Sequence, residues 1–274
     1  MKSVSEALAG RVPGATGILG KNGQEYNQVC YITDSTSRGK ATAMDGASLR
    51  KARLRKNWTQ AQAAVALDVT QAYLSMLEKG RRAPSGPFVR KALKVLDLPP
   101  TALPLQLEQA AMPRSLQKRD FSAELGALGY PGFSYLRARR QRNPAQVLLE
   151  ALNEPNLDAR VAEGLPWLAL TYVDMDWDWL VRNAKLHDRQ NRLGFAVSLA
   201  SEVAEGKNDS ERARELRQSL EVLENARLVR EDTFCHDSMT QAERVWLREH
   251  RSTAAAHWNL LTDMKGKDLA YASQ

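Results

Sequence analysis

Apolar residues recur at helical spacing through residues 48–96, with polar breaks at short intervals. The first amphipathic stretch begins at Leu49 and ends near Asn57. Thr59 then has the side chain of an N-cap, and Gln62 three residues later completes the pattern of a capping box. This arrangement predicts one short helix before Asn57 and a second that begins directly after Thr59.

The apolar run breaks again at Asp68, and a third helix is predicted beyond it. Thr70 can cap that helix, which extends from Gln71 to Glu78 and is ended by Gly80. If the corner requires a left-handed residue, Asp68 has to adopt that conformation, which Asp tolerates better than most residues. The positions expected to point into the core are Ala63, Ala64, Leu67, Val69, Leu74 and Leu77.

The third helix keeps an outer face that its apolar residues do not use. Two helices that meet at a tight corner can place the second one in the major groove of DNA, where side chains reach the edges of the bases. The residues near or on that face are Thr70, Gln71, Ala72, Tyr73, Ser75 and Met76.

Several short motifs follow one another in order: Thr59-Gln60, Ala63-Ala64, Val69-Thr70-Gln71, Leu74-Ser75, Leu77 through Arg82, and Pro84-Ser85. In this order they resemble the Cro/cI, or XRE, helix-turn-helix family. The resemblance implies four to five helices, with the third as the recognition helix. It implies base contacts from Gln71 and Ala72 and an apolar contact of Met76 with thymine methyl groups. Phosphate contacts are expected from Gln60, Lys79, Arg81 and Arg82.

The charge distribution supports the same partner, double-stranded DNA. Residues 46–98 hold eleven Lys or Arg against three acidic residues, a net of +8, whereas the whole chain is +7. Neutralising phosphates releases counterions and supplies much of the affinity for DNA. A single module of this size reads a short site, so we expect a homodimer on an inverted repeat.

The segments on either side of the helix-turn-helix domain, 44–98, have a different composition. Residues 1–43 are rich in Gly, Ser, Thr and Asn without a sustained period, and we expect a disordered extension. Met44 precedes the first helix, so an alternative start there and a flexible tail both stay open. Several prolines interrupt residues 99–119, which we interpret as a linker.

From Asp120 onward the sequence predicts a second, helical domain over residues 120–265, followed by a flexible tail at 266–274. The chain is therefore expected to be all-α. Helices are expected from Asp120 or Ser122 to Gly129, over 145–152, over 157–163 with a break at Gly164 and Pro166, from Asp176 without interruption to about Glu205, over 211–228 after Ser210, over 241–249 after Thr240, and over 253–261 after Ser252.

No catalytic or metal-binding pattern emerges from the sequence. The histidines never form H-E-x-x-H, no β pattern accompanies a Ser–Lys pair, and Cys30 and Cys235 lack metal-ligand spacing. Asp174, Asp176 and Asp178 could be imagined as metal ligands, but acidic residues at a helix N-terminus are better explained by the helix dipole. We expect no enzyme activity, no cofactor and no metal.

The remaining features concern location. No apolar run approaches the ~20 residues that cross a bilayer, and the N-terminus lacks a long apolar signal core. We therefore expect a cytoplasmic protein without a membrane partner.

Three sequence segments in the second domain resemble antitoxins encoded beside a nucleotidyltransferase-type toxin: LGYPGFSYL, NPAQVLLEALNEPNLDARVAEGLPWL and DWDWLVRNAKLHDRQNRLGFAVSLA. This resemblance implies a repressor of its own operon whose helical domain binds a cognate toxin. The alternative is a protein-interaction adaptor whose helical domain binds a partner and whose DNA affinity localises it.

Overall fold

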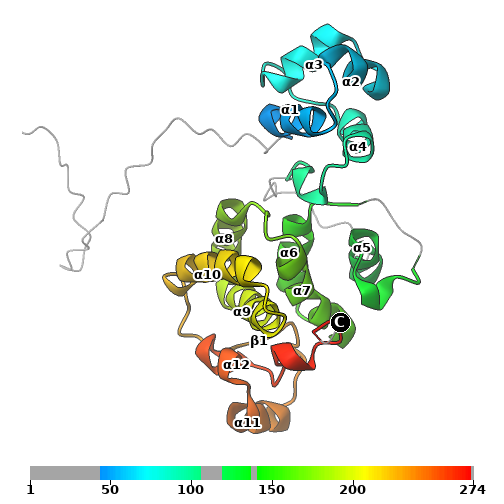
Figure 1. The fold of residues 1–274 in the computed structure, drawn as a ribbon. Helices are drawn as coiled ribbons and strands as arrows, with labels where there is room; N and C mark the ends of the chain where they lie inside the picture. The colour runs from blue at the N-terminus through cyan, green and yellow to red at the C-terminus, as the bar shows by residue number, and fades with distance from the viewer. Residues whose placement is uncertain (1–43, 106–118, 137–140, 273–274) are drawn as a thin grey trace, which may run out of the picture. The chain divides into compact units, whose positions relative to one another are not determined.

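A computed structural model describes residues 44–105, 119–136 and 141–272 of the chain (Figure 1). The extension expected to be disordered, 1–43, and residues 106–118 of the expected linker lie outside the described residues. In the part that is described, short parallel strands at Asp232–Thr233 (β1) and Leu260–Leu261 (β2) form the only sheet. Apart from an isolated bridge between Asn156 and His236, the other described residues form helices, turns and loops, which fits the all-α fold that the sequence predicts.

The helix-turn-helix domain consists of four α-helices and a short 3₁₀ turn. The helices are α1 (Gly46–Arg55), α2 (Gln60–Leu67), α3 (Gln71–Glu78) and α4 (Gly86–Val95), and the turn η1 is Pro100–Ala102. Thr59 forms the predicted capping box with Gln62. The Thr70 side chain accepts a hydrogen bond from the N–H of Tyr73, as a cap of α3.

Apolar side chains from all four helices of this domain form its core. Among the positions expected to point inward, Val69 is partly buried and packs against this core, and the others are buried. Asp68 adopts a left-handed conformation, with φ of 58° and ψ of 53°. The backbone can therefore turn between α2 and α3 without a glycine, at the position where the sequence predicted the corner.

The helical domain is built around the long helix α9. Its helices are α5 (Phe121–Leu128), α6 (Pro144–Asn153), α7 (Ala159–Thr171), α8 (Trp177–Leu186), α9 (Gln190–Gly206), α10 (Ser210–Glu224), α11 (Gln241–His250) and α12 (Thr253–His257), with 3₁₀ turns η2 (Pro131–Phe133) and η3 (Gly266–Asp268). Helix α9 packs chiefly against α7 and α10 and also touches α8, α12 and η3 (Figure 1). One buried apolar cluster extends through the domain.

The helix break predicted at Gly164 and Pro166 is wrong, because α7 continues through both residues. Gly164 is buried, and a Cβ there would come within 2.8 Å of Leu125. Pro166 is also buried and sits inside the helix. Close packing of α7 thus outweighs the lost backbone hydrogen bond that makes proline unfavourable inside a helix.

The single helix predicted from Asp176 to about Glu205 is also wrong, because α8 and α9 are separate. Helix α8 ends at Leu186, and Asp188 takes a left-handed conformation with φ of 54°. Leu186 is 74% exposed, although it continues the apolar spacing. The pattern of apolar residues crosses this turn unchanged and therefore concealed it.

The predicted ends of the last helices differ from the structure as well. Helix α10 begins after Asp209, whose side chain accepts the N–H of Arg212, and it ends at Glu224 rather than near residue 228. Helix α12 stops at His257, and its expected last residues form β2.

The flexible tail expected at 266–274 is corrected for residues 266–272. Leu269 and Tyr271 are buried in the apolar cluster of the helical domain. The Tyr271 hydroxyl donates a hydrogen bond to the backbone carbonyl of Glu163 on α7 (3.2 Å). This segment is therefore part of the folded domain.

Candidate DNA-binding surface

Helix α3 presents the face that the sequence assigned to base recognition. Leu74 and Leu77 are buried and attach the helix to the core. The candidate base-contacting residues Thr70, Gln71, Ala72 and Met76 are exposed, whereas Tyr73 and Ser75 are partly buried. The structure therefore brings the six predicted positions to one short helix and its cap, with four of them exposed.

A buried ion pair fixes the end of α3 against α1. The Arg53 guanidinium donates to both carboxylate oxygens of Glu78, at 2.6 Å and 3.0 Å, and its third nitrogen donates to the carbonyl of Trp58 at 2.7 Å. Both charged side chains are almost fully buried, at 8% and 2% exposure. Sequence reasoning missed this pair because its members lie 25 residues apart and neither breaks the apolar pattern.

The ion pair lowers the pKa of Glu78. Burial alone would raise the pKa of this carboxyl, but hydrogen bonds from Arg53 and Gln60 and the charge of Arg53 together lower it. The pKa of Arg53 is raised, because Glu78 accepts a hydrogen bond from its charged form. The ion pair that holds α1 and α3 together therefore persists to a lower pH than the ordinary pKa of a glutamate would allow.

Gln60, a predicted phosphate contact, is tied into the same network. Its side-chain amide donates to Glu78 Oε2 at 2.9 Å, and the residue is half-buried at the first position of α2. The network therefore joins α1, α2 and the end of α3. Phosphate contact by Gln60 stays a prediction, and the structure adds a fixed orientation for its amide.

The other three predicted phosphate contacts follow helix α3. Lys79 is the C-cap of α3, Gly80 takes a positive φ of 66°, and Arg81 and Arg82 come next; all three cations are exposed. The carbon at the centre of the Arg82 guanidinium lies 5.1 Å from the centre of the Tyr73 ring. The basic side chains thus lie at the C-terminal end of α3 and in the loop beyond it.

The three acidic residues near the start of α8, Asp174, Asp176 and Asp178, have local structural roles. Asp176 caps α8 by accepting the N–H of Trp179, and Asp178 lies in the first turn of that helix. Asp174 accepts a hydrogen bond from the Thr101 hydroxyl at 2.7 Å. Over the described ranges, no group of three His, Cys, Asp or Glu side chains has the arrangement of a metal site.

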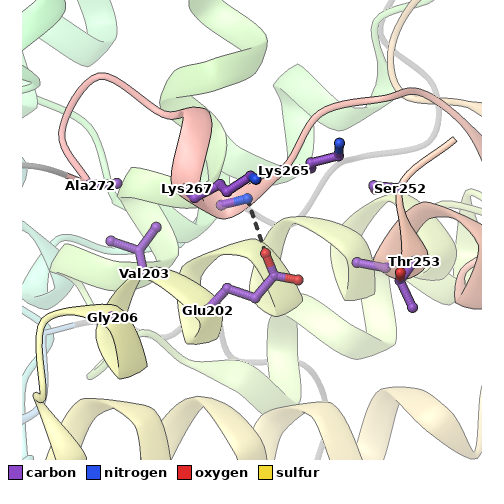
Figure 2. A pocket seen from close by; sticks show the side chains of 10 residues that line it. Glu202, Val203, Gly206, Ser252, Thr253, Lys265, Lys267 and Ala272 are labelled. Carbon is purple, nitrogen blue, oxygen red and sulfur yellow. Dashed lines mark hydrogen bonds between the residues drawn. The ribbon is translucent and has the colours of Figure 1, made fainter. Parts of the chain in front are cut away.

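The helical domain has a pocket of about 460 Å³ beside α9 (Figure 2). Figure 2 shows the Glu202 side chain extending from α9 toward the segment that carries Lys265 and Lys267, where the backbone N–H of Gly266 donates to its carboxylate at 3.0 Å. This carboxylate therefore holds the C-terminal segment on α9. A second pocket of about 610 Å³ is lined by parts of α7, α11 and the segment around β2.

The buried surroundings of Cys235 make its thiol unreactive. Burial raises its pKa to about 12, which the positive charge of nearby Arg192 offsets only in part. The thiolate, which is the nucleophilic form, is therefore scarce near neutral pH. In the part of the chain that the structure describes, no helix is long and apolar enough to cross a membrane.

Comparison with known proteins assigns the first domain to a family. Residues 49–103 match a family model described as helix-turn-helix. Neither a curated protein nor a solved structure matches the chain. The matched residues include α2 to α4, η1 and all of α1 except its first three residues, with the capped helix α3, the left-handed corner and the basic loop described above. Residues 49–103 are therefore a DNA-binding helix-turn-helix domain of the Cro/cI, or XRE, type.

Proposed function

We propose that this protein represses transcription of its own operon as a homodimer on an inverted repeat. The observation that carries the proposal is the recognition helix α3, whose Gln71, Ala72 and Met76 are exposed on the outer face of a helix anchored by a buried ion pair. The basic loop Lys79–Arg82 follows this helix directly. Exposed polar side chains on such a helix supply base recognition, and the flanking cations supply phosphate contacts.

The first experiment is a titration of the purified protein onto its own upstream DNA and onto a scrambled duplex, near physiological salt, followed by footprinting. Preference for the native sequence and a symmetric footprint with half-sites about one helical turn, ~34 Å, apart are the expected results. Equal weak binding to both duplexes would contradict the proposed repressor.

Single substitutions separate base contacts from phosphate contacts. Gln71→Ala should reduce discrimination between the two duplexes by about 1–3 kcal/mol, because an amide side chain can form paired hydrogen bonds with a base edge. Lys79→Ala should weaken both duplexes alike, because a phosphate contact carries no sequence information. Gln218→Ala, an exposed position on α10, is the matched control and should change neither. If Gln71→Ala and Lys79→Ala each lowered the affinity for both duplexes equally, these roles would be contradicted.

We also propose that the helical domain binds a protein partner and acts as the antitoxin of a toxin–antitoxin pair. The resemblance of its three sequence segments to such antitoxins supports this role. An exposed apolar surface on α11 is consistent with a partner, since Val245 is 49% and Trp246 50% exposed. If the product of the adjacent gene inhibits growth, co-expression of the full chain should restore it, and Gln71→Ala should restore it equally. Failure of both would contradict the antitoxin role.

The second candidate function is an adaptor, in which partner binding through the helical domain is primary and DNA affinity only localises the complex. The same exposed Trp246 favours it, because tryptophan is enriched at protein interfaces. The adaptor predicts that scrambled and native duplexes bind equally while the partner still binds. The titration described above therefore distinguishes the two candidates.

A further inference from the structure

Tyr73 occupies a position between the domain core and a basic side chain. It lies in the first turn of α3 and is half-buried, unlike the exposed Gln71 and Ala72 beside it. Its ring packs edge-to-face against the buried ring of Phe88 on α4, with 6.1 Å between centroids and 87° between planes. The Tyr73 ring is therefore held by the core and is less accessible than its neighbours.

The same ring also supports Arg82. The guanidinium carbon of Arg82 lies 5.1 Å from the ring centroid, within the distance at which a cation is attracted to an aromatic ring. Arg82 is exposed, and no ion pair with a described acidic residue involves it. Its charge is therefore not neutralised by a neighbouring carboxylate within the domain, while its position is restricted by the ring.

We propose that Tyr73 is a positioning residue that holds the Arg82 guanidinium ready for a DNA phosphate and does not itself read a base. This replaces the base-contacting role that the sequence suggested for Tyr73, and it rests on the proposed DNA-binding function. A free arginine side chain loses much rotamer freedom when it binds, and an aromatic support reduces that loss in advance. The phosphate contact also fixes how α3 is oriented on the duplex.

The chemistry of the contact makes the tyrosine hydroxyl dispensable. Phenylalanine keeps the ring that faces Arg82 and Phe88, whereas leucine keeps only apolar bulk. A base contact through the hydroxyl would have the opposite sensitivity, because Tyr73→Phe removes the donor and acceptor. The pair of substitutions therefore separates the two roles.

The test measures binding of the full-length protein to its upstream duplex and to a scrambled duplex over a series of salt concentrations. The variants are Tyr73→Phe, Tyr73→Leu, Arg82→Ala and the double variant Tyr73→Leu/Arg82→Ala. Arg82→Ala should lower the magnitude of the slope of log affinity against log salt by about 0.9, the value for one lost phosphate contact. Tyr73→Leu should weaken both duplexes about two- to fivefold, the fold-change that corresponds to an exposed cation–π contact.

Two comparisons decide the outcome. Tyr73→Phe should match the wild type on both duplexes, and Tyr73→Leu should cost nothing further once Arg82 is alanine. The proposal is overturned if Tyr73→Phe loses discrimination between the duplexes, or if the Tyr73→Leu and Arg82→Ala effects are additive. Arg81→Ala, which changes the neighbouring cation, is the control, and its effect should add to that of Tyr73→Leu.

A measurement without DNA keeps the test valid if Tyr73→Leu is unstable. The ring should shift the NMR resonances of the Arg82 side chain upfield in the wild type and in Tyr73→Phe, and Phe88→Leu should reduce the shift by loosening the ring. Unshifted Arg82 resonances in the wild type would overturn the contact. If the wild type binds no DNA, the proposed function fails along with the phosphate role, while these resonances still decide whether Tyr73 holds Arg82.

Discussion

Each of the two domains encloses an arginine that joins separate elements, but the two arginines have different surroundings. In the helix-turn-helix domain, Arg53 is bound by one carboxylate and one carbonyl. In the helical domain, Arg192 is 1% exposed and its guanidinium is bound by Asp232, Asp237 and the carbonyls of Leu152 and Glu154. Arg53 on α1 holds the end of α3 and the Trp58 carbonyl that precedes α2, whereas Arg192 closes the interior where α6, α9 and β1 meet.

The difference predicts how much stability each domain should lose when one member of its buried ion pair is replaced. Removing one member of a buried ion pair leaves the other charge without compensation, and the cost grows with burial. Hydrogen–deuterium exchange of the full chain, read separately for peptides of each domain, reports the free energy of opening of both domains in one sample. The following predictions use that measurement, from the largest expected effect to the smallest.

Arg192→Met should destabilise the helical domain by about 3–5 kcal/mol and leave the helix-turn-helix domain unchanged. Asp232 and Asp237 would lose the hydrogen bonds and charge that neutralise them. Arg189→Met is the matched control, since Arg189 lies 3.8 Å from the same Asp232 carboxylate but is more exposed. It should cost less than about 1 kcal/mol. Equal losses of stability in Arg192→Met and Arg189→Met would show that the burial of Arg192 does not make its ion pairs stronger.

Glu78→Gln should destabilise the helix-turn-helix domain by about 2–3 kcal/mol, because Arg53 would keep a buried charge without its partner. The pKa of Glu78 is lowered from the ordinary value of 4.5, so its contribution is fully present above about pH 4.5 and is lost as the pH falls through the lowered pKa. The variant should therefore lose stability at neutral pH and respond less to acid.

Asp97→Asn is the control for Glu78, because Asp97 pairs with Lys56 in the same domain but is 77% exposed in its side chain. Its cost should stay within about 0–1 kcal/mol. An acid response unchanged by Glu78→Gln would show that another group controls the pH dependence of this domain.

Gly194→Ala should destabilise the helical domain by about 1–3 kcal/mol through overpacking. A Cβ on Gly194 would come within 2.4 Å of the indole ring of Trp258, which is fully buried. Gly206→Ala at the end of the same helix α9 is the control, because its Cβ would meet nothing within 4 Å. That change should be neutral or stabilise the domain by up to about 1 kcal/mol. Similar effects at both glycines would contradict tight packing of Trp258 on α9.

Asp68→Gly should have the smallest effect, a stabilisation of no more than about 1 kcal/mol in the helix-turn-helix domain. Glycine takes the left-handed conformation at φ of 58° without steric cost. The loss of the exposed 3.7 Å pair with Lys91 offsets part of the gain. Asp188→Gly repeats the substitution at the left-handed turn before α9 and should act in the same direction on the helical domain. A clear destabilisation at Asp68 would assign its side chain a further role.

The helix-turn-helix domain could be predicted closely because its boundaries are set by local signals. Thr59 and Thr70 cap the helices that follow them, and Asp68 turns the chain between these helices. Each signal acts within four residues, so a reading along the chain detects it. The ion pair between Arg53 and Glu78 depends on the fold and could not be detected in that way.

The helical domain was predicted less well because its boundaries depend on distant contacts. Gly164 is accommodated inside α7 because Leu125 on α5 lies against it, and the turn at Asp188 interrupts an apolar spacing that continues on both sides. Asp120, Asn143, Thr240 and Ser252 cap their helices as predicted. These capped starts were therefore recognised, although α10 is capped by Asp209 rather than by the predicted Ser210, whereas the ends and breaks set by packing were not.

The buried position of Tyr271 has a consequence for the order in which the protein is made. The core of the helical domain includes Trp258, Leu269 and Tyr271, so it stays incomplete until these residues leave the ribosome. The helix-turn-helix core is complete at Leu103, 168 residues earlier in the chain. At about 5–20 residues per second, synthesis of the intervening chain takes about 10–30 s. During each round of translation, a nascent chain therefore carries a folded DNA-binding domain before its second domain can close.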